Sequence, residues 1–171
     1  HKNVIYISPK QQEKIKKTRV LFAGVGLGSV IAEAAMRLGF EDFVFIDGDD
    51  VELSNLNRQN YHQQDIGKPK VKAIKKHMQS INPNVKIKTH NLFLDPTKGI
   101  AQYLKGCDIA INAIDFDDNQ TPFEFDKICK KKGIPEIHPF NFGWAGAAYL
   151  ITPNSPQIYD VPRYDGRFEL I

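Results

Sequence analysis

The sequence has few of the residues that build disulfide or zinc frameworks. Only two of its 171 residues are cysteines, Cys107 and Cys129. They show neither paired zinc-ligand spacing nor the cysteine set of a disulfide-rich secreted fold. The histidines are not spaced as metal ligands either. A surface or core role is expected for each of them: His62, His77, His90 and His138. We therefore expect a cytoplasmic protein without zinc, and we interpret both cysteines as structural.

Long apolar runs and a strong charge of one sign are also absent. No stretch approaches the roughly 18 apolar residues that a membrane-spanning helix needs, so no membrane partner is expected. The net charge of +3 is too small to indicate a nucleic-acid partner by itself. The chain begins at His1 rather than methionine. We therefore expect that the chain can lack residues of a longer protein at either end.

Short apolar runs alternate with amphipathic stretches along the chain. We expect strands at 19–23, 43–46, 85–89, 108–114 and 145–151, and helices at 29–38, 69–80 and 121–132. This alternation predicts an α/β fold: a Rossmann-like, doubly wound, mostly parallel sheet with helices on both faces. A single domain is expected over residues 1–171, with a core at 10–150 and an irregular tail at 151–171.

A glycine-rich turn follows the first expected strand. Gly24, Gly26 and Gly28 allow a tight turn and a close approach to phosphate, and the next helix offers free backbone N–H groups. Asp47 ends the second strand, where a carboxylate bonds a ribose hydroxyl in dinucleotide-binding folds. The pattern predicts nucleotide binding, although a glycine-rich turn can also be purely structural.

A dense polar segment, residues 48–59, comes directly after Asp47. Asn55, Arg58 and Gln59 can reach toward a triphosphate from it. The planar, always charged guanidinium of Arg58 suits phosphate oxygens. The alternative interpretation is a helix cap with Ser54 as N-cap and the other side chains solvated, and for Ser54 it is the better one.

Lysines cluster at the start of the helix expected from Pro69. Proline favours the first helical position, so Lys70 and Lys72 are expected in the first turn. Lysine is unfavourable beside the positive end of the helix dipole, and a bound polyphosphate would remove that conflict. The alternative is a generally basic, solvated helix, which Lys75 and Lys76 support.

Acidic residues follow the strand expected at 108–114. Asp115, Asp117, Asp118 and Asn119 come at its carboxyl end, the edge where ligands bind in open α/β sheets. Their hard oxygens suit Mg²⁺, which needs only one or two protein carboxylates when phosphates supply other ligands. Capping of the next helix by Asp117 or Asp118 is an alternative that is compatible with a metal role.

Together these blocks resemble the ThiF/MoeB/HesA superfamily, the bacterial relatives of ubiquitin-activating enzymes. The similarity runs from about Gln11 to Tyr149, and its most specific block is Asp47 to Gln59. The resemblance implies a doubly wound homodimer that uses ATP and Mg²⁺. It implies adenylation of the C-terminal glycine of a ubiquitin-like or sulfur-carrier protein, with release of pyrophosphate.

The resemblance also implies residue roles. Asp47 would hold the ribose, Asp118 would hold Mg²⁺, and Arg58, Lys70 and Asp118 would be catalytic. The residues implied in nucleotide binding are Gly24, Gly26, Gly28, Asp47, Asn55, Arg58, Lys70 and Asp118.

The chain departs from the family pattern at several points. Its glycine loop is one residue shorter than the usual GxGGxG, and Phe123 stands where an arginine is usual. Neither the usual arginine near the N-terminus nor the paired CxxC motifs are visible. Neither cysteine occupies the position of a thioester acceptor, so no thioester step is expected. The alternatives are a tRNA-modifying dehydratase of the same superfamily, an NAD(P)-dependent oxidoreductase and a partner subunit without catalytic activity.

Overall fold

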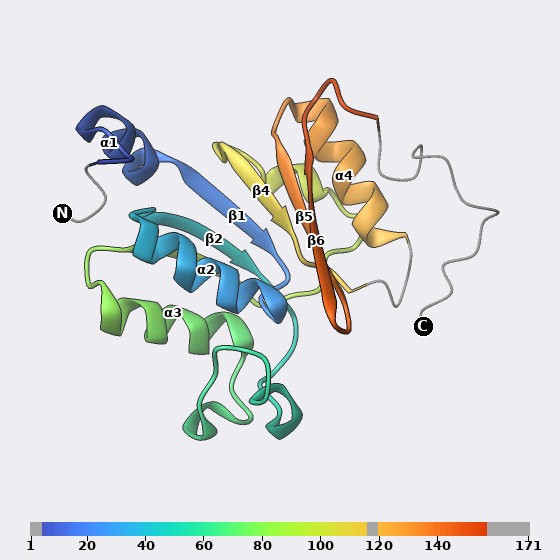
Figure 1. Ribbon diagram of the computed structural model, residues 1–171. Coiled ribbons are helices and arrows are strands. Elements are labelled where there is room, and N and C mark those ends of the chain that lie inside the picture. Colours follow the sequence, from blue (N-terminus) through green and yellow to red (C-terminus); the bar gives the residue numbers. More distant parts are fainter. Residues whose placement is uncertain (1–4, 116–119, 157–171) are drawn as a thin grey trace.

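The structure, a computed structural model, describes residues 5–115 and 120–156 (Figure 1). Its six-stranded sheet has the order β3-β2-β1-β4-β5-β6. The strands are β1 Arg19–Ala23, β2 Asp42–Ile46, β3 Lys86–His90, β4 Ile109–Asn112, β5 Glu136–Phe142 and β6 Ala145–Ile151. All neighbouring pairs are parallel except β5 and β6, which form an antiparallel hairpin. The expected doubly wound, mostly parallel sheet is confirmed.

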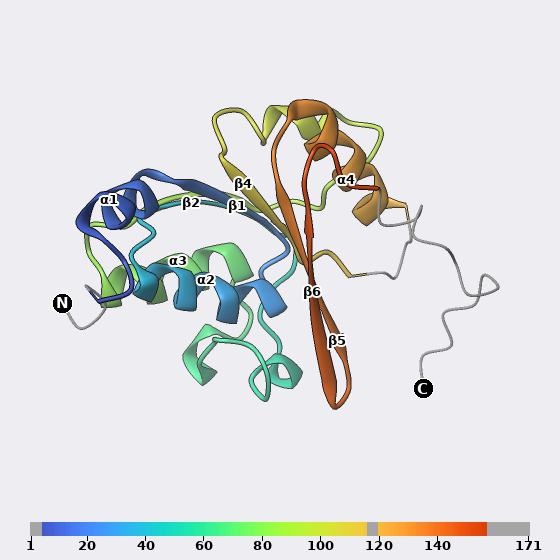
Figure 2. The same ribbon diagram turned by 45° about the horizontal axis from the view of Figure 1, so that its top comes forward.

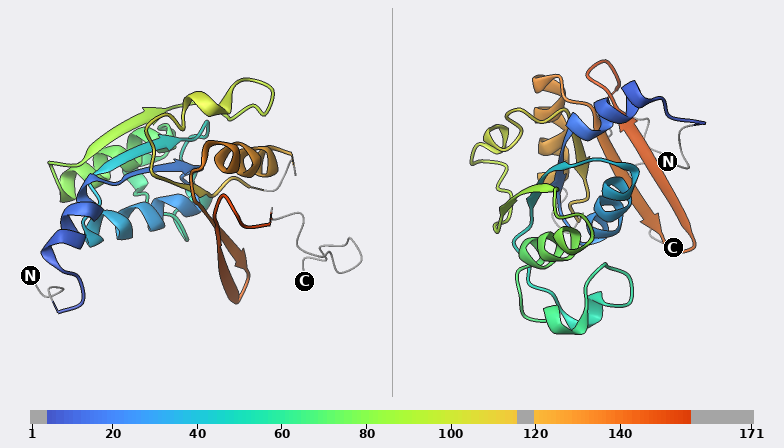
Figure 3. Two further views of the ribbon diagram at one scale, coloured as in Figure 1. Left: turned by 90° about the horizontal axis from the view of Figure 1, so that it is seen from above. Right: turned by 90° about the vertical axis from the view of Figure 1, so that its left-hand side faces the viewer.

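Four α-helices and three short 3₁₀ helices accompany these strands in the described residues. The α-helices are α1 Pro9–Lys17, α2 Leu27–Leu38, α3 Lys70–Ile81 and α4 Thr121–Lys132. The 3₁₀ helices are η1 Leu53–Asn55, η2 Gln63–Asp65 and η3 Ile100–Gln102. Figure 3 shows α2 and α3 on one face of the sheet, with α4 and η3 on the other.

The alternation of strand side chains divides the core into two layers. Phe22 of β1 and Phe43 and Phe45 of β2 face α2 and α3, where they form an aromatic cluster with ring centroids 5.6–6.2 Å apart. Leu21 and Val44 face the opposite way, into the layer under η3 and α4. Each buried aliphatic or phenyl side chain stabilises the fold by about 1.5–3 kcal/mol. Both faces of the central strands are therefore buried, as a parallel sheet requires.

Local signals predicted both ends of α4 and the C-terminal end of α2 correctly. Helix α4 runs over its expected span and ends at Gly133, which adopts the left-handed conformation. Helix α2 begins at Leu27, two residues before the expected start at residue 29. The prediction for Pro69 is wrong by one position, because Pro69 is the N-cap of α3 and Lys70 is its first residue.

The hairpin of β5 and β6 closes one edge of the sheet. It turns at Gly143, whose φ of 68° favours glycine, and Trp144 beside it is fully exposed. Figure 2 shows the hairpin extending beyond the other strands. The strand β6 matches its expected range, whereas β5 was not expected. In the part of the chain that the structure describes, none of the helices combines the length and the apolar character of a membrane span.

Candidate functional site

The candidate site lies at the carboxyl ends of β1, β2 and β4. The chain order of the strands reverses between β1 and β4, which have their neighbouring helices on opposite faces. Ligands of doubly wound sheets bind at such a switch point. The turn after β1 carries the three glycines, and Asp47 directly follows β2.

The three glycines have different surroundings, and Gly24 is required by its backbone conformation and its packing. Gly24 has a φ of 87°, and a Cβ there would lie 2.3 Å from the carbonyl oxygen of Ala113. A Cβ on Gly28 would lie 3.3 Å from the ring of Phe22. Gly26 differs, because the group nearest to its missing Cβ is the side-chain amide of Gln59. The glycines thus bring the loop close to β4 and leave Gly26 facing the polar segment.

Asp47 connects the loop to the segment that follows β2. One carboxylate oxygen accepts a hydrogen bond from the Val25 amide at 2.8 Å, and the other accepts one from the Asp49 amide at 2.9 Å. Burial raises the pKa of Asp47 above its usual range, although these hydrogen bonds and the charge of Lys70 oppose the rise. The structure therefore brings Asp47, the glycine loop and Lys70 together.

The segment after Asp47 forms η1 and folds onto itself. Asn55 is buried, and its side-chain oxygen accepts a hydrogen bond from the Glu52 amide at 2.9 Å. Glu52 is the N-cap of η1, and Ser54 lies inside that 3₁₀ helix. The interpretation of Ser54 as the N-cap is therefore wrong, because the turn starts two residues earlier.

Arg58 and Gln59 follow η1 with different surroundings. Arg58 is exposed, and its Nη1 donates to the carbonyl oxygen of Ser54 at 2.8 Å and to Asn57 Oδ1 at 3.1 Å. Gln59 Oε1 is shielded from solvent and has no hydrogen-bond partner among the described residues. The Gln59 amide beside Gly26 is thus a polar group that a ligand in the loop would meet.

Lys70 stands at the first position of α3 and is buried there. Only 9% of its side chain is exposed, and Nζ lies 2.7 Å from Asp49 Oδ2. Its backbone amide donates to the Asp49 carbonyl oxygen at 2.9 Å. The Asp49 carboxylate therefore already offsets the conflict with the helix dipole that was expected to need a polyphosphate. Lys72, in the same turn, is exposed.

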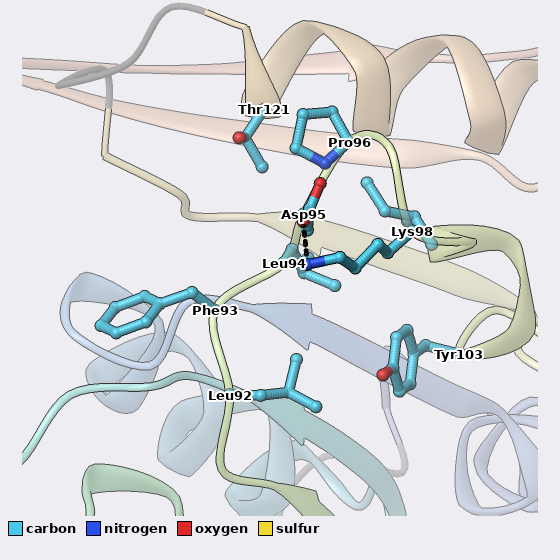
Figure 4. Close-up of a pocket in the computed structure, with 9 residues that line it drawn as sticks. Leu92, Phe93, Leu94, Asp95, Pro96, Lys98, Tyr103 and Thr121 are labelled. Atoms are coloured by element: carbon cyan, nitrogen blue, oxygen red, sulfur yellow. Dashed lines mark ion pairs between the residues drawn. The ribbon is translucent and has the colours of Figure 1, made fainter.

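A cavity of about 440 Å³ lies beside this edge of the sheet (Figure 4). Its lining is mostly apolar and comes from the segment after β3 and from η3, with Thr121 at the start of α4: Leu92, Phe93, Leu94, Asp95, Pro96, Lys98, Ile100, Tyr103 and Thr121. The Phe93 ring lies over Gly48, within 2.6 Å of the position of a Cβ there. The cavity therefore adjoins Asp47. The sequence does not predict this cavity, because the segment that lines it carries no recognisable motif.

The predicted magnesium ligand, Asp118, belongs to a segment that the structure does not describe. Asp117, Asp118 and Asn119 lie outside the described residues, and Asp115, the last described residue before them, is exposed. Across residues 5–115 and 120–156, no group of three histidine, cysteine or acidic side chains is arranged to hold a metal ion. The role of Asp118 stays a prediction.

This fold and its glycine loop define the chain as a Rossmann-like α/β protein of the nucleotide-binding type. Within that class, the ThiF family matches residues 1–167, and the chain belongs to this family.

Curated relatives match most of the length of this chain. The molybdopterin-synthase adenylyltransferase of Haemophilus influenzae is 30% identical over 156 residues, 89% of this chain and 63% of that protein. The SAMP-activating enzyme E1 of Haloferax volcanii is 28% identical over 152 residues, 88% of this chain and 55% of that enzyme. The tRNA threonylcarbamoyladenosine dehydratase of Bacillus subtilis is 30% identical over 164 residues, 95% and 62%. The chain thus spans little more than half the length of these relatives.

A solved structure with a similar fold is a nucleotide complex. The tRNA N6-threonylcarbamoyladenosine dehydratase of E. coli, in complex with ATP, is 27% identical and superimposes with a TM-score of 0.74. The match covers 80% of this chain and 56% of that one. A structure of PaaA is 32% identical with a TM-score of 0.67, covering 76% of this chain and 40% of that one.

Proposed function

We propose that this protein uses ATP to adenylate a carboxylate. The observation that carries the proposal is the buried ammonium of Lys70 at the start of α3, close to Asp47 and the glycine loop. A buried ammonium makes strong charge-assisted hydrogen bonds, which suits a polyphosphate. The adenylyltransferases among the relatives and the ATP complex of the dehydratase support it.

The neighbouring groups suggest how the nucleotide lies. Asp47 would accept a hydrogen bond from the ribose, since its oxygens have lone pairs beyond those facing Val25 and Asp49. The apolar cavity next to Phe93 would receive the base, and its volume lies in the range of ligand sites. The phosphates would then pass the glycine loop toward Arg58 and Lys70. Arg58 has guanidinium N–H groups that its two hydrogen bonds leave available.

The chemistry needs charge stabilisation more than proton transfer. The substrate carboxylate attacks the α-phosphorus, the bond to the β-phosphate oxygen breaks, and pyrophosphate leaves. Arg58 and Lys70 would stabilise the charge that develops on the phosphate oxygens. Asp118 would hold Mg²⁺, with phosphate oxygens as further ligands. No general base is required, because a carboxylic acid is ionised at pH 7.

The substrate we propose is the C-terminal glycine of a ubiquitin-like or sulfur-carrier protein. Relatives named as a molybdopterin-synthase adenylyltransferase and a sulfur carrier protein ThiS adenylyltransferase support this class. The same chemistry on a small carboxylate carried by tRNA is the second candidate, supported by the Bacillus dehydratase. The family resemblance further supports a cytoplasmic homodimer.

Exchange of labelled pyrophosphate into ATP tests the proposal. We expect exchange when peptides ending in Gly-Gly are added to the native chain, and a loss of at least about 100-fold with Arg58→Ala or Asp118→Ala. Lys72→Ala, which removes an exposed lysine from the same region, should retain full exchange. Exchange that persists unchanged in the Arg58 and Asp118 variants would overturn the assignment of these residues.

A further inference from the structure

Glu33 of α2 joins three segments of the chain by hydrogen bonds. Its Oε2 accepts one from Asn60 Nδ2 at 2.8 Å and lies 2.8 Å from His77 Nε2 of α3. Its Oε1 accepts one from Arg37 Nε at 2.7 Å, one turn along α2. Only 16% of the Glu33 side chain is exposed, so water has little access to this contact.

The partner of Glu33 follows directly after two of the residues predicted to reach the phosphates. Asn60 succeeds Arg58 and Gln59 in the chain. Its backbone amide donates to Ser29 Oγ at 3.0 Å, and that hydroxyl donates to the Gly26 carbonyl oxygen at 2.7 Å. Asn60 is thus fixed by its backbone to the glycine loop and by its side chain to Glu33.

The next residue fixes the same turn a second time. The Tyr61 hydroxyl donates to the Val25 carbonyl oxygen at 2.7 Å, and the Tyr61 side chain is buried. Burial also raises the pKa of this hydroxyl, which therefore stays protonated as a donor. The turn that carries Arg58 consequently has two anchors on the glycine loop, and Glu33 adds an anionic contact to Asn60.

Glu33 is ionised when it accepts the hydrogen bond from Asn60. Burial acts to raise the pKa of Glu33, but the hydrogen bonds from His77 and Arg37 outweigh it, and the pKa is lowered. His62, two residues after Asn60, has its ring centroid 5.1 Å from that of His77, and its Nδ1 lies 3.5 Å from Asp65 Oδ2. A charged, half-enclosed acceptor makes stronger hydrogen bonds than a neutral one.

We propose that Glu33 is a positioning residue, which sets the distance of Arg58 and Gln59 from the glycine loop through Asn60. The proposal rests on the proposed ATP site. Glu33 touches no part of that site itself. It acts by holding Asn60 against α2 and α3, so that Gln59 stays against Gly26 and Arg58, its neighbour in the chain, stays near the loop. A shift of about 1 Å in such a group is enough to weaken a phosphate contact substantially.

A role-reversal experiment tests it, with ATP as the titrant and calorimetry as the readout. Asn60→Asp sets a second carboxylate against Glu33, and we expect the Kd for ATP to rise about tenfold. The double variant Glu33→Gln/Asn60→Asp restores an amide-to-carboxylate hydrogen bond with the roles exchanged. We expect it to bring the Kd back to within about threefold of the native value.

Two controls separate the possible causes. Glu41→Gln removes the same charge just before the start of β2, at the opposite end of the sheet from the site, where Glu41 pairs with Lys16. It should leave ATP binding unchanged. Urea unfolding of each variant shows whether affinity follows stability. If the double variant binds ATP no better than Asn60→Asp alone, or if Asn60→Asp binds like the native chain, the positioning role is refuted. If the native chain does not bind ATP, the proposed function fails instead.

Discussion

The substitution Lys70→Met separates the binding role of Lys70 from its structural role. Methionine keeps most of the buried alkyl chain and removes the ammonium that lies 2.7 Å from Asp49. The Asp49 side chain is 48% exposed, so water can solvate its carboxylate once the lysine is gone. The free energy of unfolding should therefore fall by only about 1 kcal/mol.

ATP binding should respond much more strongly to the same change. A hydrogen bond between ionised groups contributes about 1.5–3 kcal/mol, which corresponds to a rise of roughly 10- to 150-fold in the Kd for ATP. Calorimetric titration with ATP and Mg²⁺ measures this loss, and urea unfolding measures the stability. Lys72→Met is the matched control, because Lys72 lies in the same helical turn but is exposed.

The result that would refute this reasoning is specific. If Lys70→Met binds ATP as tightly as the Lys72→Met control, the ammonium of Lys70 contacts no phosphate. If the free energy of unfolding falls by several kcal/mol, Lys70 is primarily a structural partner of Asp49. Either outcome removes the observation on which the proposed function depends.

Three further changes have predictable results. Gly24→Ala should destabilise the fold by about 3 kcal/mol in urea unfolding, because of the positive φ and the 2.3 Å approach to Ala113; native-like stability would contradict this. Phe93→Ala should weaken ATP binding about tenfold in calorimetry if the cavity receives the base, and an unchanged Kd would exclude it. Burial raises the pKa of Glu136 to about 8, so the native chain loses stability as the pH rises from 4.5 to 8. Glu136→Gln should lack that loss in unfolding curves at pH 5 and pH 9, and parallel curves for both proteins would contradict it.

The strands and helices that the sequence predicted well have strong local signals. The apolar run of β4 and the lysines and Gly133 at the end of α4 are of this kind. Strand β5 could not be predicted in the same way. It contains Pro139 and two fully buried polar residues, Glu136 and His138, so it lacks the apolar alternation that marks a strand. Its pairing with the distant strand β4, where Ala110 lies opposite Glu136, and its hairpin with β6 stabilise it.

The candidate site likewise contains some features that the sequence predicts and others that it does not. The glycine loop and Asp47 were predictable because their spacing follows from one strand-turn-helix unit and the next strand. The pairing of Lys70 with Asp49 and the contact of Glu33 with Asn60 join segments 21 and 27 residues apart. Such contacts depend on how α2 and α3 pack against the sheet, and a single sequence carries no local pattern for them.

A comparison of ATP and NADH binding tests the central claim most directly. Both nucleotides suit a glycine loop followed by an acid, but only ATP uses a cationic cluster for its triphosphate. Calorimetry on the native chain with Mg²⁺ should show one ATP site whose affinity falls in Arg58→Ala, and NADH should neither bind tightly nor displace ATP. Tight NADH binding with no detectable ATP binding would contradict the account.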